Sequence, residues 1–175
     1  MDNDTSLIIP VTTAAFVQPF RTRYLHRPGV TMPPHITVRA PFKPVRALTA
    51  DDYHTLATVC ASFPPFAFTL RRLARFVETG VLYLAPEPTE PFRALYHTLY
   101  RQYPEPPENH AMVVFHLTLA RKHPPDLDQL AAEFDRTYGA HLPIQAIATE
   151  LSLYEKRQER WFKKAAFPLG QPQVT

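Results

Sequence analysis

Apolar and polar residues alternate in several short stretches of the chain, and between these stretches apolar residues recur at helical spacing. A period of two is typical of strands, whereas apolar residues three and four positions apart favour a helix. This pattern predicts strands at residues 6–11, 34–40, 66–72, 81–85, 112–120, 144–152 and 161–167. It predicts helices at residues 12–24, where Pro19 interrupts the pattern, and at residues 49–61, 91–103 and 126–138.

The predicted elements repeat in the same order along the chain. Each half runs strand, helix, strand, helix, strand, and the last two strands are joined by a charged turn at residues 155–160. Loops are expected at residues 25–32 and 105–110, and a loose tail at residues 170–175. We therefore predict an α+β protein in which residues 1–175 form one domain with two similar lobes, built around the strands at 34–40 and 112–120.

The middle strand of each half contains a histidine and a threonine two residues apart. The first stretch reads PPHITVRAPF and places His35 and Thr37 on one face, with aliphatic residues on the other. The second reads FHLTLAR and places His116 and Thr118 on one face in the same way. A single histidine on a strand is more often structural than catalytic, and a short motif alone is a weak signal. The recurrence in matched positions indicates a functional pair facing one cleft.

Two imidazoles on opposite sides of a cleft suit the cleavage of a phosphodiester. In-line displacement at phosphorus needs a base for the attacking oxygen and an acid for the leaving oxygen, and imidazole titrates near neutral pH. Threonine hydroxyls on the same faces can donate hydrogen bonds to the non-bridging oxygens. This scheme needs no metal or other cofactor, and the sequence has neither an HExxH motif nor a close histidine pair on a helix.

Composition narrows the choice of function further. The net charge of +3 modestly favours an anionic partner but is small for a protein that coats nucleic acid. With only 4 glycines, the chain has no glycine-rich phosphate loop or dinucleotide fingerprint. The single cysteine, Cys60, excludes an intrachain disulfide and favours a reducing, cytoplasmic location. The acidic amino-terminal residues do not resemble a signal peptide, and no apolar run is long enough for a membrane span.

The stretches PPHITVRAPF and FHLTLAR resemble the paired His-x-Thr motifs of the two-histidine phosphoesterase superfamily, in particular its 2′-5′ RNA ligase and cyclic phosphodiesterase branch. The resemblance implies a bilobal, pseudo-symmetric α+β fold with two antiparallel sheets, helices outside and a central cleft. It implies that His35, Thr37, His116 and Thr118 are catalytic. It further implies metal-independent opening of a 2′,3′-cyclic phosphate on RNA ends or small nucleotides, with reversible 2′-5′ ligation in some relatives. By resemblance we assign His116 as the base and His35 as the acid, and we expect a monomer.

Three further residues are candidates for substrate binding. Relatives often have an arginine at the position of Arg121, which the resemblance places on the substrate phosphate or ribose. Strict alternation puts Arg121 on the opposite face from Thr118, so the strand must end or bulge for it to reach the cleft. Arg39 follows the alternation of the first motif and is a weaker candidate. Among aromatic residues that could stack on a base, we favour Tyr154, with Phe42, Tyr24 and Tyr83 as alternatives.

Two other functions stay open on the sequence alone. The chain could be a non-catalytic RNA-binding module on the same fold, although such a module has no need of two titrating imidazoles at matched positions. It could also hydrolyse a different cyclic phosphate or a linear 2′-5′ bond, because the loops that would select the base and the sugar cannot be placed from the sequence.

Overall fold

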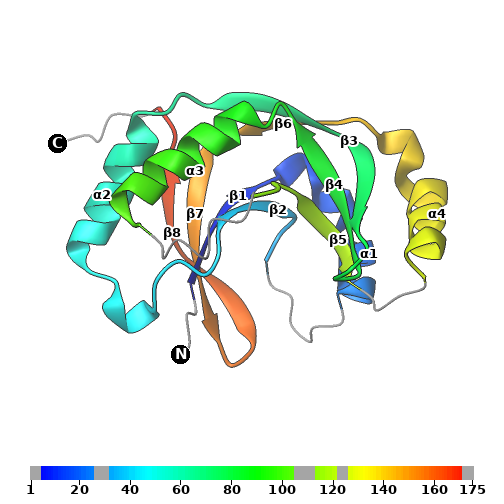
Figure 1. The fold of residues 1–175 in the computed structure, drawn as a ribbon, viewed down its shortest axis with the longest axis horizontal. Coiled ribbons are helices and arrows are strands. Elements are labelled where there is room, and N and C mark those ends of the chain that lie inside the picture. Colours follow the sequence, from blue (N-terminus) through cyan, green and yellow to red (C-terminus); the bar gives the residue numbers. More distant parts are fainter. Residues whose placement is uncertain (1–4, 26–31, 105–112, 122–125, 171–175) are drawn as a thin grey trace.

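The strands form two four-stranded antiparallel sheets, and the helices lie outside them (Figure 1). The computed structural model describes residues 5–25, 32–104, 113–121 and 126–170. The first sheet has the order β2 (His35–Arg39), β1 (Thr5–Pro10), β7 (Glu150–Arg157) and β8 (Arg160–Pro168). The second has the order β5 (Leu117–Arg121), β4 (Val81–Glu87), β3 (Phe66–Phe76) and β6 (Ile144–Ala148). The strands of the two motifs, β2 and β5, therefore each lie at the edge of a sheet.

Within the described residues, four α-helices connect these strands, and they confirm the helical spacing of the sequence. They are α1 (Gln18–Tyr24), α2 (Ala50–Ala61), α3 (Glu90–Gln102) and α4 (Leu127–Tyr138). Short 3₁₀ helices accompany them in the described residues, namely η1 (Thr12–Val17), η2 (Val45–Ala47) and η4 (Gly139–His141). Pro19 does not interrupt a helix as the sequence suggested. It lies in the first turn of α1, where proline is tolerated because the N–H it lacks would have no intrahelical partner.

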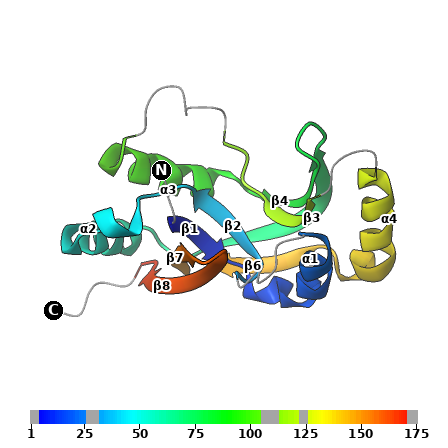
Figure 2. The same cartoon turned by 90° about the horizontal axis from the view of Figure 1, so that it is seen from below.

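One hydrophobic core joins the two sheets. It contains fully buried side chains from both of them, such as Leu7 and Ile36 from the first sheet and Leu84 and Leu117 from the second. The predicted apolar face of α3 enters the same core through Phe92. Figure 2 shows α3 and α2 on one side of the strands and α4 at the far end. Because close-packed side chains connect the sheets, the core fixes the two edge strands in relation to each other.

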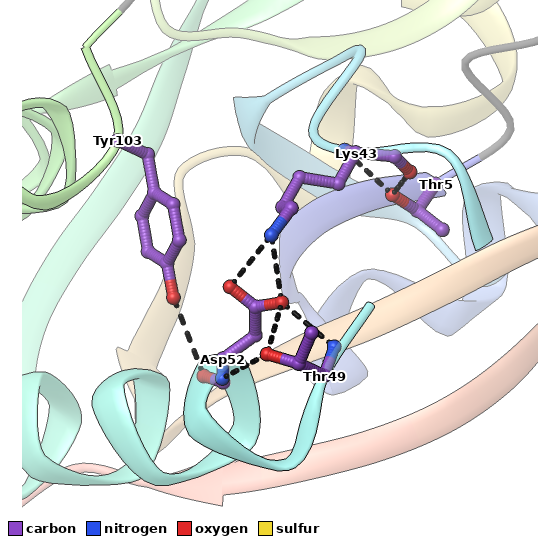
Figure 3. Close-up of polar contacts among 5 residues, drawn as sticks. All are labelled: Thr5, Lys43, Thr49, Asp52 and Tyr103. Carbon is purple, nitrogen blue, oxygen red and sulfur yellow. Dashed lines mark hydrogen bonds and ion pairs between the residues drawn. The ribbon is translucent and has the colours of Figure 1, made fainter. Parts of the chain in front are cut away.

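A buried carboxylate fixes the start of α2 and the loop after β2 (Figure 3). Thr49 caps the helix by accepting a hydrogen bond from the N–H of Asp52, and the Asp52 carboxylate accepts one from the N–H of Thr49. The same carboxylate accepts hydrogen bonds from Lys43 Nζ at 2.7 and 2.8 Å. The N–H of Lys43 in turn donates to the Thr5 hydroxyl, which connects this cluster to β1.

The predicted strand at residues 144–152 is wrong in its extent. The chain forms two strands there, β6 and β7, and they belong to different sheets. The charged turn is also shorter than predicted, because β7 pairs with β8 as far as Arg157 and Arg160. Gln158 and Glu159, at φ 46° and 64°, make the turn itself. Ladder hydrogen bonds between β7 and β8 hold the charged residues on either side of this turn extended, from Glu155 to Arg157 and at Arg160, and local composition does not reveal such pairing.

The repeat in the sequence is confirmed as an order of elements, but the two sheets do not correspond to the two halves of the chain. Strand β3, from the first half, pairs with β4 and β6 in the second sheet. Strand β7, from the second half, pairs with β1 in the first sheet. The strand at 66–72 also extends to Phe76, and β5 begins later than predicted, at Leu117. Most of the predicted loops at 25–32 and 105–110, and the tail beyond residue 170, lie outside the described residues.

Candidate active site

Both His-Thr pairs line a single cavity of about 440 Å³. His35 and Thr37 come from β2, whereas His116 lies directly before β5 and Thr118 lies within it. All four side chains are half-buried, while the aliphatic residues between them point into the core. Alternation along each edge strand therefore produces the predicted arrangement, in which two imidazoles and two hydroxyls meet in one solvent-accessible space.

The two histidines are held by the same local contact. His35 Nδ1 lies 2.7 Å from the carbonyl oxygen of Pro33, and His116 Nδ1 lies 2.7 Å from that of Val114. A carbonyl oxygen only accepts, so each Nδ1 is the donor and carries the proton of the neutral ring. Each Nε2 is then the nitrogen that can accept or deliver a proton, and the two imidazoles have matched tautomers.

The surroundings of the two imidazoles keep both of them neutral. Burial lowers the pKa of His35 to about 4, and the nearby guanidinium of Arg21 adds to this effect. Burial also lowers the pKa of His116, with the hydrogen bond to Val114 opposing it and the charge of Arg121 adding to it. The ring of His116 lies edge-on to Phe76, with 5.1 Å between ring centroids, and 5.2 Å from Tyr83. At neutral pH the cavity thus contains two uncharged imidazoles.

A β-bulge in each motif strand decides which arginine reaches the cavity. The pairing of β4 with β5 shifts register between Leu82 and Tyr83, and Arg121 lines the cavity beside Thr118. The pairing of β1 with β2 shifts in the same way between Leu7 and Ile8. Ala40 occupies the position in the first motif that Arg121 occupies in the second, five residues after the histidine, and it also lines the cavity. An extra residue in one strand reverses the alternation of faces beyond it. The strand therefore bulges, as the sequence required if Arg121 was to reach the cleft.

The bulge in β2 also explains why Arg39 is not among the residues that line the cavity. The bulge turns Arg39 away from the face of His35, and its side chain is only 7% exposed. Its Nη1 donates to the carbonyl oxygen of Tyr103 at 2.5 Å, and its guanidinium lies 5.7 Å from the ring of Phe42. The expectation that simple alternation brings Arg39 to the cleft therefore does not hold in the structure.

The aromatic ring that lines the cavity is Trp161, not Tyr154. Tyr154 is 7% exposed and packs with Ile8 and Met32, and Trp161 packs against this small cluster. Met32 and Trp161 themselves line the cavity, so Tyr154 lies behind residues that a ligand could touch. Trp161 stands among charged residues near the β7–β8 turn, where the local sequence favours a solvated hairpin and does not indicate a residue of the cavity.

Arg21 of α1 is a further cavity residue that the sequence did not indicate. Nothing in the local sequence distinguishes it from Arg23, two positions later on the same helix. Arg21 is 2% exposed, whereas Arg23 lies at the surface near Glu133, with 3.5 Å between Nη1 and Oε1. The two arginines differ in exposure because α1 packs against β5, and this packing buries Arg21.

Within the described ranges, no group of three or more histidine, cysteine, aspartate or glutamate side chains is arranged to hold a metal ion. The helices of those ranges include none that is long and apolar enough to cross a membrane.

Comparison with known proteins agrees with this geometry. Residues 9–160 match the family model of the 2′-5′ RNA ligase superfamily. A Bacillus pumilus (strain SAFR-032) protein named "Putative phosphoesterase" is 30% identical over 92 residues. That match covers 52% of this chain and 53% of the relative, so the chain spans about half the length of the curated relative it matches.

The fold is shared with solved structures at low sequence identity. The crystal structure of E. coli LigT complexed with 3′-AMP has a TM-score of 0.62 and 16% identity, over 96% of this chain and 98% of that chain. A crystal structure of a Thermus thermophilus protein has a TM-score of 0.62 and 15% identity, over 95% and 98% of the two chains. These similarities support the assignment of two antiparallel sheets with outer helices to a known fold.

Proposed function

Because this chain belongs to the 2′-5′ RNA ligase superfamily, we propose that it is a phosphodiesterase that opens 2′,3′-cyclic phosphates on RNA ends or small nucleotides. The observation that carries the proposal is the single cavity lined by His35, Thr37, His116 and Thr118. Two imidazoles with matched tautomers supply a base and an acid, and two hydroxyls can donate to the oxygens of one phosphate. Substrate phosphate would lie between the two edge strands.

In the proposed reaction, Nε2 of His116 accepts a proton from water while the water oxygen bonds to phosphorus. The bond between phosphorus and the 3′-oxygen breaks, and His35 delivers its proton to that oxygen. The product has a 2′-phosphate and a free 3′-hydroxyl. The roles of the two histidines exchange in the reverse direction. In 2′-5′ ligation a 5′-hydroxyl would take the place of water in the same step: it loses its proton to His116, its oxygen bonds to phosphorus, and the 3′-oxygen leaves with the proton of His35. The assignment of base and acid comes from family resemblance and stays a prediction.

The acid must be protonated before the leaving group departs, although burial and, to a lesser degree, the charge of Arg21 lower the pKa of His35 and oppose its protonation before substrate enters. A phosphodiester is an anion, and an anion beside an imidazole favours its protonated form. Entry of substrate would therefore load His35 with the proton that it later delivers.

Nucleotide-like ligands are consistent with this proposal. Crystal structures of E. coli LigT are complexed with 3′-AMP, ATP and phosphate, and this chain shares that fold. In this chain Arg121 and Trp161 line the cavity. We propose that Arg121 contacts a phosphate or ribose of the substrate and that Trp161 stacks on a base. A cytoplasmic location stays a prediction from the single cysteine.

The proposal is tested by turnover of 2′,3′-cyclic mononucleotides, RNA with a cyclic phosphate end, and 2′-5′ oligonucleotides. His35→Ala and His116→Ala should each lower kcat by about 10²–10⁴, because each removes one proton-transfer partner. The double variant should lose less than the product of the single losses, since the two groups act as a unit. His54→Ala, at an exposed position on α2, is the matched control and should leave kcat unchanged.

If the wild-type protein binds RNA ends but turns over none of these substrates, the chain is a binding module and the proposed activity is wrong. Turnover of only the 2′-5′ oligonucleotides would refute the cyclic phosphate as the substrate and support a linear linkage.

A further inference from the structure

The cavity contains a buried cation that lies next to both motif strands. Arg21 lines the cavity from α1 and is one of the largest fully buried side chains of the protein. Its Nε donates to the carbonyl oxygen of Thr118 at 2.9 Å, and its Nη1 donates to that of Met32 at 3.3 Å. Thr118 is a motif residue of β5, and Met32 lies three residues before His35. The guanidinium therefore sits between the two strands that present the catalytic pair.

Among the described residues, the hydrogen-bond acceptors of Arg21 are all neutral. Its third bond is from Nη1 to Gln18 Oε1, at 2.6 Å. None of the ion pairs in the described part of the chain includes Arg21, whereas Lys156, another cation lining the cavity, pairs with Glu159 at 2.7 Å. Burial lowers the pKa of Arg21 to about 10, so the guanidinium still carries its full charge at neutral pH.

A buried charge without a counter-ion is costly, and such charges in proteins are normally paired. The surface arginine of the same helix, Arg23, has Glu133 nearby although it gains little from that contact. The buried one, which would gain most from a carboxylate, has none among the described residues. An anion that enters the cavity would supply the missing charge.

We propose that Arg21 is a phosphate-binding residue of this cavity, and that it contacts a non-bridging oxygen of the substrate phosphate from the buried side, while the exposed Arg121 contacts the substrate from the opening. This inference rests on the proposed function for the identity of the anion as a nucleotide phosphate. The planar guanidinium of Arg21 is already fixed by three hydrogen bonds, so little side-chain entropy is lost when it binds an oxyanion.

The alternative is that Arg21 only clamps α1 to the motif strands. A clamp would matter for the stability of the fold and would leave the phosphate affinity of the folded protein unchanged. The two roles therefore predict different results for binding of a simple anion, and inorganic phosphate is a suitable probe because it needs no turnover.

Calorimetric titration of inorganic phosphate at pH 7 into the full chain tests the proposal. Arg21→Met should weaken phosphate binding about 10- to 100-fold, as expected for loss of a hydrogen bond to a charged group. Arg21→Lys keeps the charge but loses the planar fork, so its affinity should lie between those of Arg21→Met and the wild type. Arg23→Met, two positions along the same helix, should bind phosphate as the wild type does.

A second measurement uses only the wild-type protein, so it decides the question even if Arg21→Met fails to fold. Phosphate should shift the side-chain Nε resonance of Arg21 in an NMR titration and leave that of Arg23 in place. The proposal is overturned if this resonance does not move, if the wild type binds no phosphate, or if folded Arg21→Met binds phosphate as tightly as the wild type. Absence of turnover in the wild type would refute the proposed function but would not alter these affinities.

Discussion

Lowering the pH from 7 to 5 should destabilise the folded protein through His35. Its pKa is about 4 in the folded chain, against an ordinary value of 6.5 that we take for the unfolded chain. Between these two values the unfolded chain binds a proton that the folded chain does not, so the free energy of unfolding falls as the pH falls. Integration of this linkage between pH 7 and pH 5 gives a loss of about 2 kcal/mol, out of about 3 kcal/mol once the pH is well below both pKa values.

The assay is urea denaturation at half-unit steps from pH 7 to pH 5, on the wild type and on His35→Asn. Asparagine does not titrate, and its side-chain amide can still donate to the carbonyl oxygen of Pro33. The wild type should therefore lose about 2 kcal/mol more than the variant over this range. His116, whose pKa is also lowered, titrates in both proteins, so only its interaction with His35, the smallest of the influences that shift the His35 pKa, is left in the difference.

Acidic groups change the free energy of unfolding mainly at pH values below this range. Burial raises the pKa of Asp52, but its hydrogen bonds from Lys43 and Thr49 outweigh this and lower the pKa overall. The stability that it contributes is therefore lost only as the pH falls towards and below about 4. Equal pH dependence in the wild type and His35→Asn would refute the reasoning, as would an NMR titration of the His35 ring with a midpoint at or above 6.5.

Three further predictions follow from the site and from the network in Figure 3. Thr37→Val and Thr118→Val should each lower kcat by about 10²-fold or less, since each removes one donor to the phosphate; unchanged rates would show that the hydroxyls do not contact it. Turnover should persist in EDTA because the two imidazoles carry out both proton transfers, and an activity that EDTA abolishes and a divalent ion restores would contradict this mechanism. Asp52→Asn should lower the free energy of unfolding by about 1–3 kcal/mol in urea denaturation, because Lys43 loses its charged partner; the neighbouring Asp51→Asn, at an exposed position, should change it by less than about 0.5 kcal/mol.

Local periodicity was enough to determine the helices, most strands and the faces of the two motifs. His35 and Thr37 share a face because alternation is a property of a single extended strand, whatever strand lies beside it. The same argument placed His116 and Thr118 together, and the helical spacing of Phe92, Leu95 and Leu99 identified the buried face of α3. The recurrence of one order of elements also predicted that the two motifs occupy equivalent places.

Tertiary structure alone decided how far that alternation continues and which distant residues join the site. The bulges that bring Arg121 to the cavity and turn Arg39 away depend on hydrogen bonds to β4 and β1, which are not encoded in the motif strands themselves. Arg21 reaches the cavity because α1 packs against β5, almost one hundred residues away in sequence, where its Nε meets the carbonyl oxygen of Thr118. The pairing of strands across the two halves has the same origin, because β3 pairs with β4 and β6, and one edge of β7 pairs with β1 while the other pairs with β8. Pairing and packing between distant segments are collective, so a local pattern predicts the face of a residue but not the neighbour it meets there.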